Sequence, residues 1–397
     1  NQPFTDDGTP SQAARTTLAG EGLYKTIGHA TARIMTTTPP CTDQITPATR
    51  KVLIINTAAI SHPGTQQYVQ EIKDALIAEG WLPTDIDVRS RAGSDDRAFL
   101  PDSMTRAVGY GLVFIIAHGC LADPGDGVQH AFIQCCRTGG VTEVLQPEQW
   151  AILMDERNKA RLIRCQTPAE NGGFVKDIYA RDDYLIEQMA VGDEALVYFI
   201  APHSWSVANG IAEQGAGSSL GWEGAFHGND GQRAVLGMIR RMTADNTWTT
   251  DVQAFENLLA SGLGTSQAPD DQTTTAKLTD IAGAFYLPAW GHFTVDPDNF
   301  PEKAVQADVS ISYADCPGTA IDFTINANES MDMEYLSAGE ATVTVQALNN
   351  AGDIIGSGLH KIPVNGGQND LQLATCEGTA KIRLFEYPEE GRDAATR

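Results

Sequence analysis

Two apolar runs of strand length end in residues that suit acid–base or acyl-transfer chemistry. The run 112–117 is followed by His118 and Gly119, and the run 195–201 is followed by Pro202. An imidazole can serve as a general base near neutral pH, and a glycine leaves its backbone N–H accessible to a developing oxyanion. Because reactive groups gather beyond the carboxyl ends of parallel strands, this pattern predicts a crevice there. The alternative is that His118 is a structural residue at a strand end.

The elements that would position these residues begin at Lys51. The continuous apolar run 52–56 is typical of a strand buried on both faces of a parallel sheet. Apolar residues at spacings of three and four over 68–76 predict a helix, which Gly80 closes. Residues 84–89 alternate as in a strand. This succession predicts an α/β fold with a doubly wound, mostly parallel sheet and flanking helices.

The later segments extend the same fold. Apolar spacing predicts helices at about 231–242 and 251–261, and Thr250 is placed as the N-cap of the second. We expect the insertion 121–193 to consist of loops and short helices, and the polar segment 265–275 to be a loop.

The chain is expected to contain three regions. Residues 1–50 are rich in Thr, Ala, Asp and Pro and predict an extended N-terminal arm. Residues 51–292 form the α/β domain. From 304 to 390 the apolar residues alternate in short runs separated by Gly, Asn and Asp, which predicts an antiparallel, immunoglobulin-like β-sandwich.

Two cysteines, Cys316 and Cys376, fall inside the expected sandwich. A disulfide between them would close a long loop and contribute up to about 4 kcal/mol to stability. Such a bond forms in an oxidising compartment, so we expect a protein that is secreted or exposed at the cell surface. The alternative is a pair of buried thiols.

Charge and hydropathy exclude several classes of protein. There are 27 Lys plus Arg against 51 Asp plus Glu, a net charge of −24, which argues against nucleic-acid binding. No apolar run reaches the roughly 18 residues of a membrane span, so none is expected. Asp123 and Asp126, in a loop rich in Gly and Pro, are candidate calcium ligands, or else solvated carboxylates. No other cofactor is expected.

The order of these motifs resembles that of the caspase-like cysteine peptidases of the clostripain and gingipain group. The resemblance covers about residues 51–288: an apolar strand ending in His-Gly, an insertion, a second apolar strand, and the sequence Gly-Ala-Gly-Ser-Ser-Leu-Gly-Trp-Glu-Gly at 215–224. It implies that His118 corresponds to the family's catalytic base and Gly119 to its oxyanion donor. It also implies a nucleophilic cysteine after the second strand.

Pro202 occupies that nucleophile position. Proline has no thiol and no backbone N–H, so it supplies neither the nucleophile nor the second oxyanion donor. One missing donor costs about 3 to 4 kcal/mol of transition-state stabilisation, and the missing nucleophile costs more. Ser204 and Cys120 are alternative nucleophiles. Cys120 lies two residues after His118, so both side chains can face the same side of an extended segment. The alternative is that Cys120 is a structural thiol or a disulfide partner.

Two hypotheses for function follow. The first is an exported, catalytically inactive caspase-like protein that binds a protein partner, or assembles with itself, through the N-terminal arm or a sandwich edge. The second is an active cysteine endopeptidase in which His118 works with a cysteine other than the residue at position 202.

Overall fold

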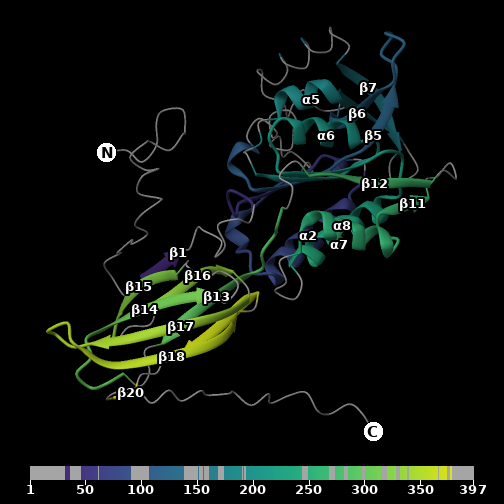
Figure 1. Ribbon diagram of the computed structural model, residues 1–397. Coiled ribbons are helices and arrows are strands. Elements are labelled where there is room, and N and C mark those ends of the chain that lie inside the picture. Colours follow the sequence, from purple (N-terminus) through teal and green to yellow (C-terminus); the bar gives the residue numbers. More distant parts are fainter. Residues whose placement is uncertain are drawn as a thin grey trace. The chain divides into compact units, whose positions relative to one another are not determined.

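The protein divides into two compact units in the computed structural model (Figure 1). One unit comprises residues 43–289, and the other combines residues 1–42 with residues 290–397. The structure describes residues 32–35, 46–60, 62–90, 107–137, 151, 155, 161–168, 174–189, 191, 194–243, 249–267, 273–280, 285–296, 300–313, 320–327, 331–337, 339–364, 366–372 and 376–377.

The larger unit is built on a mixed sheet in the order β11-β12-β10-β9-β4-β2-β3. β3, β2, β4, β9 and β10 are parallel, and β12 and β11 follow in antiparallel pairing at one edge. The predicted α/β architecture with a mostly parallel sheet is therefore confirmed at this level. The strands are Val52–Asn56 (β2), Ile86–Ser90 (β3), Leu112–Ile116 (β4), Leu196–Ile200 (β9), Ser218–Trp222 (β10), Thr265–Gln267 (β11) and Thr273–Asp280 (β12).

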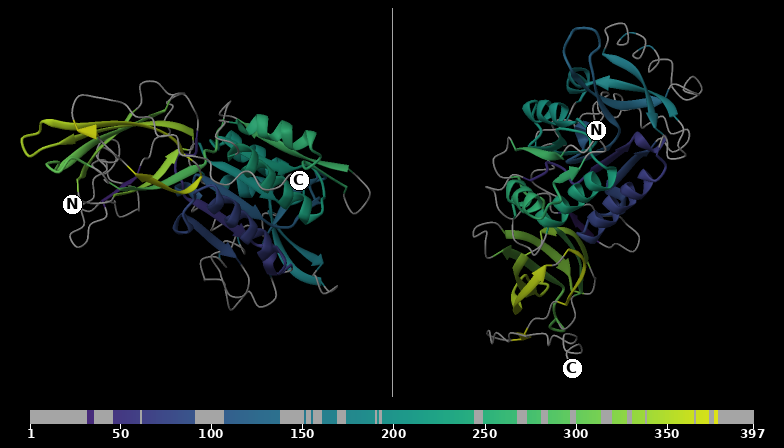
Figure 2. Two further views of the ribbon diagram at one scale, coloured as in Figure 1. Left: turned by 90° about the horizontal axis from the view of Figure 1, so that it is seen from below. Right: turned by 90° about the vertical axis from the view of Figure 1, so that its right-hand side faces the viewer.

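Helices cover both faces of this sheet. Figures 1 and 2 show α5 and α6 over one face and α2, α7 and α8 over the other. The capping box of Thr250 and Gln253 opens α8 and confirms the predicted N-cap. The helices are Thr65–Ala78 (α2), Asp182–Gln188 (α5), Trp205–Glu213 (α6), Gly228–Thr243 (α7) and Asp251–Ala260 (α8), with 3-10 turns at Ala58–Ile60, Pro83–Asp85 and Ala107–Gly109.

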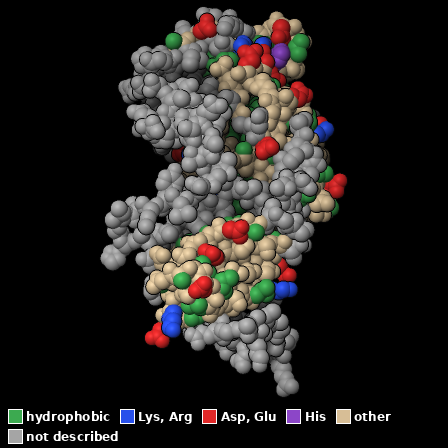
Figure 3. Space-filling model, turned by 60° about the vertical axis from the view of Figure 1, so that its left-hand side comes forward, with side chains coloured by type: hydrophobic (Ala, Val, Ile, Leu, Met, Phe, Trp, Pro, Cys, Tyr) green, Lys and Arg blue, Asp and Glu red, His purple; other side chains and the backbone are tan. Residues whose placement is uncertain are grey.

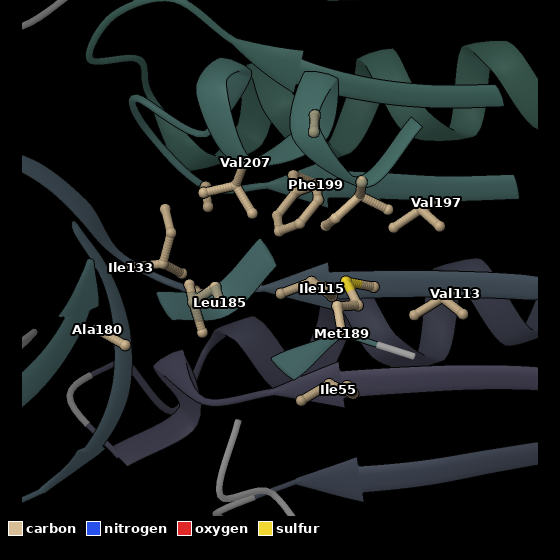
Figure 4. Close-up of a cluster of buried hydrophobic side chains, with 14 of the residues drawn as sticks. Ile55, Val113, Ile115, Ile133, Ala180, Leu185, Met189, Val197, Phe199 and Val207 are labelled. Atoms are coloured by element: carbon tan, nitrogen blue, oxygen red, sulfur yellow. The ribbon is translucent and has the colours of Figure 1, made fainter. Parts of the chain in front are cut away.

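Every residue of β2, β4 and β9 is buried, which explains why these strands are continuous apolar runs in the sequence. Successive side chains point to opposite faces, so each strand contributes to two cores. The core beneath α5 and α6 is drawn in Figure 4. Its labelled members are Ile55, Val113, Ile115, Ile133, Ala180, Leu185, Met189, Val197, Phe199 and Val207.

The insertion after β4 forms a second sheet, in the order β5-β6-β8-β7. The expectation of loops and short helices over 121–193 was therefore wrong for most of its described part. Polar residues inside the sheet, such as Gln134 and Asp177, bond to one another, so no apolar run reveals the strands. These strands are Gly119–Ala122 (β5), His130–Arg137 (β6), Leu162–Pro168 (β7) and Phe174–Arg181 (β8).

The polar segment 265–275 was expected to be a loop, but its described residues belong to β11 and β12. Thr is β-branched and suits a strand, and the segment alternates between buried and exposed positions. Ser266, Thr274 and Ala276 are the buried ones. The sheet thereby gains an antiparallel edge.

The C-terminal unit contains two sheets, β15-β14-β17-β18-β20 and β1-β16-β13-β19. Buried side chains of β14, β15 and β17 share one core with Met331, Met333 and Leu336 of β16, so the two sheets pack face to face. The strands are Ala32–Met35 (β1), Trp290–Asp296 (β13), Gln306–Tyr313 (β14), Ala320–Asn326 (β15), Met331–Ser337 (β16), Gly339–Leu348 (β17), Ile354–Val364 (β18), Gly367–Gln372 (β19) and Cys376–Glu377 (β20).

Two features of this unit differ from a sandwich formed by residues 304–390 alone. β1 comes from the predicted arm and pairs in parallel with β16, and β13 begins at Trp290 and pairs in parallel with β19. Of the two cysteines expected to bond, Cys316 lies outside the described residues, and only the backbone of Cys376 is described.

The surface of the described residues agrees with the composition. Figure 3 shows acidic side chains dispersed over one face, with basic ones between them and no basic stripe. Within the described residues, no helix combines the length and apolar character needed to cross a bilayer.

A carboxylate lies fully buried at the start of α8. Asp251 Oδ1 accepts hydrogen bonds from the backbone N–H groups of Val252 (2.8 Å) and Phe285 (3.3 Å). Burial raises the pKa of this carboxyl from its ordinary value to about 6, and the nearby Ser218 hydroxyl opposes the rise.

This raised pKa predicts that Asp251 stabilises the fold in acid. The native state holds the proton of Asp251 more tightly than the unfolded state does. The contribution of Asp251 to the free energy of unfolding is therefore complete below pH 4 and is lost as pH rises through 6. We expect Asp251→Asn to remove this pH dependence and to increase the free energy of unfolding at pH 8 by up to about 3 kcal/mol. Urea unfolding from pH 4 to 8 measures both. Glu256→Gln, on the exposed face of α8, is the control, and an unchanged pH slope in Asp251→Asn would contradict the assignment.

Candidate functional site

The carboxyl ends of three neighbouring strands meet at one edge of the main sheet. Asn56, Ile116 and Ile200 end β2, β4 and β9, and they are aligned in register with one another. The chain passes from β2 to β3 on one side and returns to β4 on the other, so the order reverses between β2 and β4. Such a reversal is where ligands bind in open α/β sheets.

Gly119 and Pro202 are in direct backbone contact at this edge. The Ala117 N–H donates to the Ile200 carbonyl at 3.1 Å, which continues the pairing of β4 and β9. A β-carbon on Gly119 would overlap the carbonyl oxygen of Pro202. Only glycine allows this approach. The two strand ends that the sequence singled out are therefore adjacent.

His118 makes its side-chain contact with another histidine. Its Nε2 lies 2.8 Å from Nδ1 of His62, with the ring centroids 4.5 Å apart and the planes tilted by 57°. At this distance one nitrogen donates and the other accepts. Within the described residues, the hydrogen-bonding partner of the His118 ring is thus an imidazole and not a thiol.

His62 lies in the turn between β2 and α2, and a buried polar cluster holds that turn in place. The Asn56 side chain contacts the Thr65 hydroxyl at 3.1 Å, and its Oδ1 accepts from the Ala59 N–H at 3.1 Å. The Thr65 hydroxyl donates to the His62 carbonyl at 2.7 Å. Because Asn56 ends β2, the strand end itself sets the position of His62.

His118 is held from the other side by the second sheet. The His118 N–H donates to Gln134 Oε1 at 3.3 Å, and the Gln134 N–H donates to the His118 carbonyl at 2.8 Å. Gln134 Nε2 in turn donates to Oδ2 of the buried Asp177 at 2.7 Å. The Thr57 hydroxyl donates to the Gln134 carbonyl at 2.9 Å, which links both histidine-bearing loops.

The electrostatic environment keeps His118 neutral. Burial of the ring, with a smaller contribution from the charge of His62, lowers the pKa of His118 from its ordinary value to about 4. The His118 ring is therefore neutral at neutral pH and needs no counter-ion.

The other candidate nucleophiles do not meet the His118 ring. Ser204 is buried, and its hydroxyl accepts from the Trp222 N–H at 3.1 Å. Cys120 follows Gly119 in β5 and is partly exposed, and it is a thiol, as is the buried Cys135 of β6. The structure therefore brings His118, Gly119 and Pro202 together, and among the described residues the hydrogen-bonding partner of the His118 ring is His62.

Asp123 and Asp126 lie in the turn between β5 and β6. Asp123 Oδ1 accepts from the N–H groups of Gly125 (2.8 Å) and Gly127 (3.0 Å), and Asp126 Oδ2 lies 3.0 Å from His130 Nε2. In the described part of the chain, no cluster of three or more His, Cys, Asp or Glu side chains is arranged to hold a metal ion. Calcium binding at this turn stays a prediction.

Sequence reasoning missed His62 and Gln134. His62 lies in the turn after β2, and His118 comes after β4. The rule that reactive groups gather beyond the carboxyl ends of parallel strands could therefore have indicated His62 as well. Gln134 carried no signal, because its role depends on the pairing of β5 with β6.

No protein-family model matches this chain, and no curated protein matches it. Its function is therefore proposed from the geometry of the strand ends.

The contact between Gly119 and Pro202 can be tested by stability. Gly119→Ala forces a β-carbon against a backbone oxygen of a buried strand end, so we expect a loss of about 2 to 3 kcal/mol or more in the free energy of unfolding. Gly109→Ala is the matched control, because a β-carbon there meets no atom within 4 Å. Equal stability of the two variants in urea would show that the strand ends do not touch.

The His62–His118 contact predicts an unusual titration. In NMR spectra of histidine-labelled protein, we expect the His118 ring to titrate near pH 4, and His62→Ala to raise that pKa because it removes a neighbouring charge. Since the native pKa lies below that of the unfolded chain, the contribution of His118 to stability is present above pH 6.5 and is lost as pH falls toward 4. A His118 midpoint above pH 6 would contradict the burial of the ring, and an unchanged midpoint in His62→Ala would contradict the contact.

Proposed function

We propose that this protein is a caspase-like pseudoenzyme that serves as a binding or assembly scaffold. The observation that carries the proposal is Pro202 at the strand end beside His118 and Gly119. A peptidase of the proposed family needs a thiol at that position, and proline offers neither a nucleophile nor an N–H for the oxyanion.

The surroundings of His118 support an inert site. A general base must reach the proton of its nucleophile, either directly or through one water. The Nε2 atom of His118 is already bonded to His62 at 2.8 Å, and Ser204 uses its hydroxyl within the fold. The residues at the strand ends therefore stabilise one another.

The N-terminal arm supports the proposed role in assembly. β1 forms an edge strand beside β16, which lies about 300 positions later in the sequence. In this pairing Ala32 is opposite Met331 and Met35 is opposite Glu334. Strand addition of this kind is a common mode of assembly. The same edge of a second copy presents the same acceptor, so we propose that the arm joins copies.

The edge formed by β18 and β20 is less suited to strand addition than the edge beside β16. Within the described residues, β18 pairs with β20 only at Gly356 and Ser357, which leaves its later residues at an edge. That edge carries Lys361 and Pro363, residue types that block edge-to-edge pairing. The arm is therefore the better candidate for assembly, and secretion with a Cys316–Cys376 disulfide completes the proposal.

The second candidate is an active cysteine endopeptidase that uses His118. It is favoured by the position of His118 at the point where the strand order reverses. In this case one cysteine would be labelled stoichiometrically by a peptide electrophile, and His118→Ala would abolish the labelling.

Labelling decides between the two candidates. We expect the wild-type protein to show no His118-dependent labelling by a peptidyl electrophile in mass spectrometry. Pro202→Cys should place a thiol at the strand end and introduce labelling that His118→Ala removes. Ser204→Cys, at a buried position, is the matched control and should stay unlabelled. Labelling of the wild type that depends on His118 would overturn the inactive assignment.

Assembly is tested separately. We expect the full chain to show a molar mass that rises with concentration in light scattering, and deletion of residues 1–42 to abolish the rise. Ile34→Pro keeps the arm but removes one backbone N–H from β1, so it should weaken assembly as well. A monomeric full chain at every concentration would exclude self-assembly through the arm.

A further inference from the structure

The pair formed by His62 and His118 has the donors of a metal site. Two imidazole nitrogens lie 2.8 Å apart, and the ring planes are tilted by 57°. Both residues are partly exposed, although the His118 ring is mostly buried. Imidazole nitrogen is a preferred ligand of Zn²⁺, Ni²⁺ and Cu²⁺ and a poor one for Ca²⁺ or Mg²⁺.

We propose that His62 Nδ1 and His118 Nε2 together bind one divalent transition-metal ion, with water in its remaining positions. The proposal does not depend on the caspase-like resemblance or on the proposed scaffold function.

The geometry needs only a small adjustment. Two nitrogens bound at about 2.0 to 2.1 Å to a tetrahedral ion are about 3.3 Å apart, so the pair must open by about 0.5 Å. The ring that now donates would carry its proton on its other nitrogen, so that both facing nitrogens offer a lone pair to the ion. His118 is fixed by Gln134 in the second sheet, whereas His62 lies in the turn before α2, so we expect His62 to make the movement.

The segments that carry the two donors are held within the fold by hydrogen bonds. Asn56 and Thr65 hold the backbone at His62, and Gln134 with Asp177 holds the backbone at His118, so the two rings stay close to one another. With two protein ligands, the ion keeps its remaining positions for water.

The test uses the untagged full chain, freed of metal with a chelator. Titration calorimetry with Zn²⁺, and separately with Ni²⁺, should give one ion per chain, whereas Ca²⁺ and Mg²⁺ should give no heat from this site. We expect His62→Ala and His118→Ala each to weaken Zn²⁺ binding by at least tenfold. His203→Ala and His227→Ala, at neighbouring strand ends, are matched controls and should bind within about twofold of the wild type. Absence of binding, or equal binding by all four variants, would overturn the proposal.

A second measurement needs no substitution. In NMR spectra of histidine-labelled wild-type protein, a substoichiometric amount of Cu²⁺ should broaden the ring signals of His62 and His118 before those of the other histidines. Earlier broadening of any other histidine would overturn the assignment, whether or not the variants fold.

Discussion

The structure depends on the parallel register of β2, β4 and β9. Residues aligned across these strands bring three carboxyl ends to one line, so that Gly119 touches the carbonyl of Pro202 and His118 reaches His62. A shift of one residue would turn every side chain of a strand to the opposite face and would separate these groups. Both faces of the strands are buried in apolar cores, which makes such a shift costly.

The polar groups at the strand ends satisfy one another. Asn56 and Thr65 hold the turn that carries His62, and Gln134 with Asp177 holds the backbone of His118. Buried polar networks are stable when their members are bonded, and they fix one arrangement of the surrounding loops. The network accounts for the position of His118 after β4, because its members contribute to the fold.

The edges of the sheets are protected in different ways in the two units. In the larger unit, antiparallel β11 and β12 extend the parallel sheet with a short, partly polar edge. In the C-terminal unit, β1 covers β16, and Lys361 with Pro363 lies on the edge formed by β18. An edge that is covered by a strand from the other end of the chain can also accept that strand from a second copy, since the hydrogen bonds are identical. The assembly proposed above would therefore draw on the same contacts as folding.

The sequence alone determined the continuous strands, the helix that follows Thr250, the alternation of the C-terminal region and the ends of the strands before 118 and 202. These features follow from local periodicity and capping, which need no knowledge of distant residues. Only the tertiary structure decided that the insertion forms a sheet, that β1 joins the C-terminal unit, and that His62 and Gln134 surround His118. These features depend on pairing between residues far apart in the chain, where polar side chains such as Gln134 are buried because distant partners satisfy them.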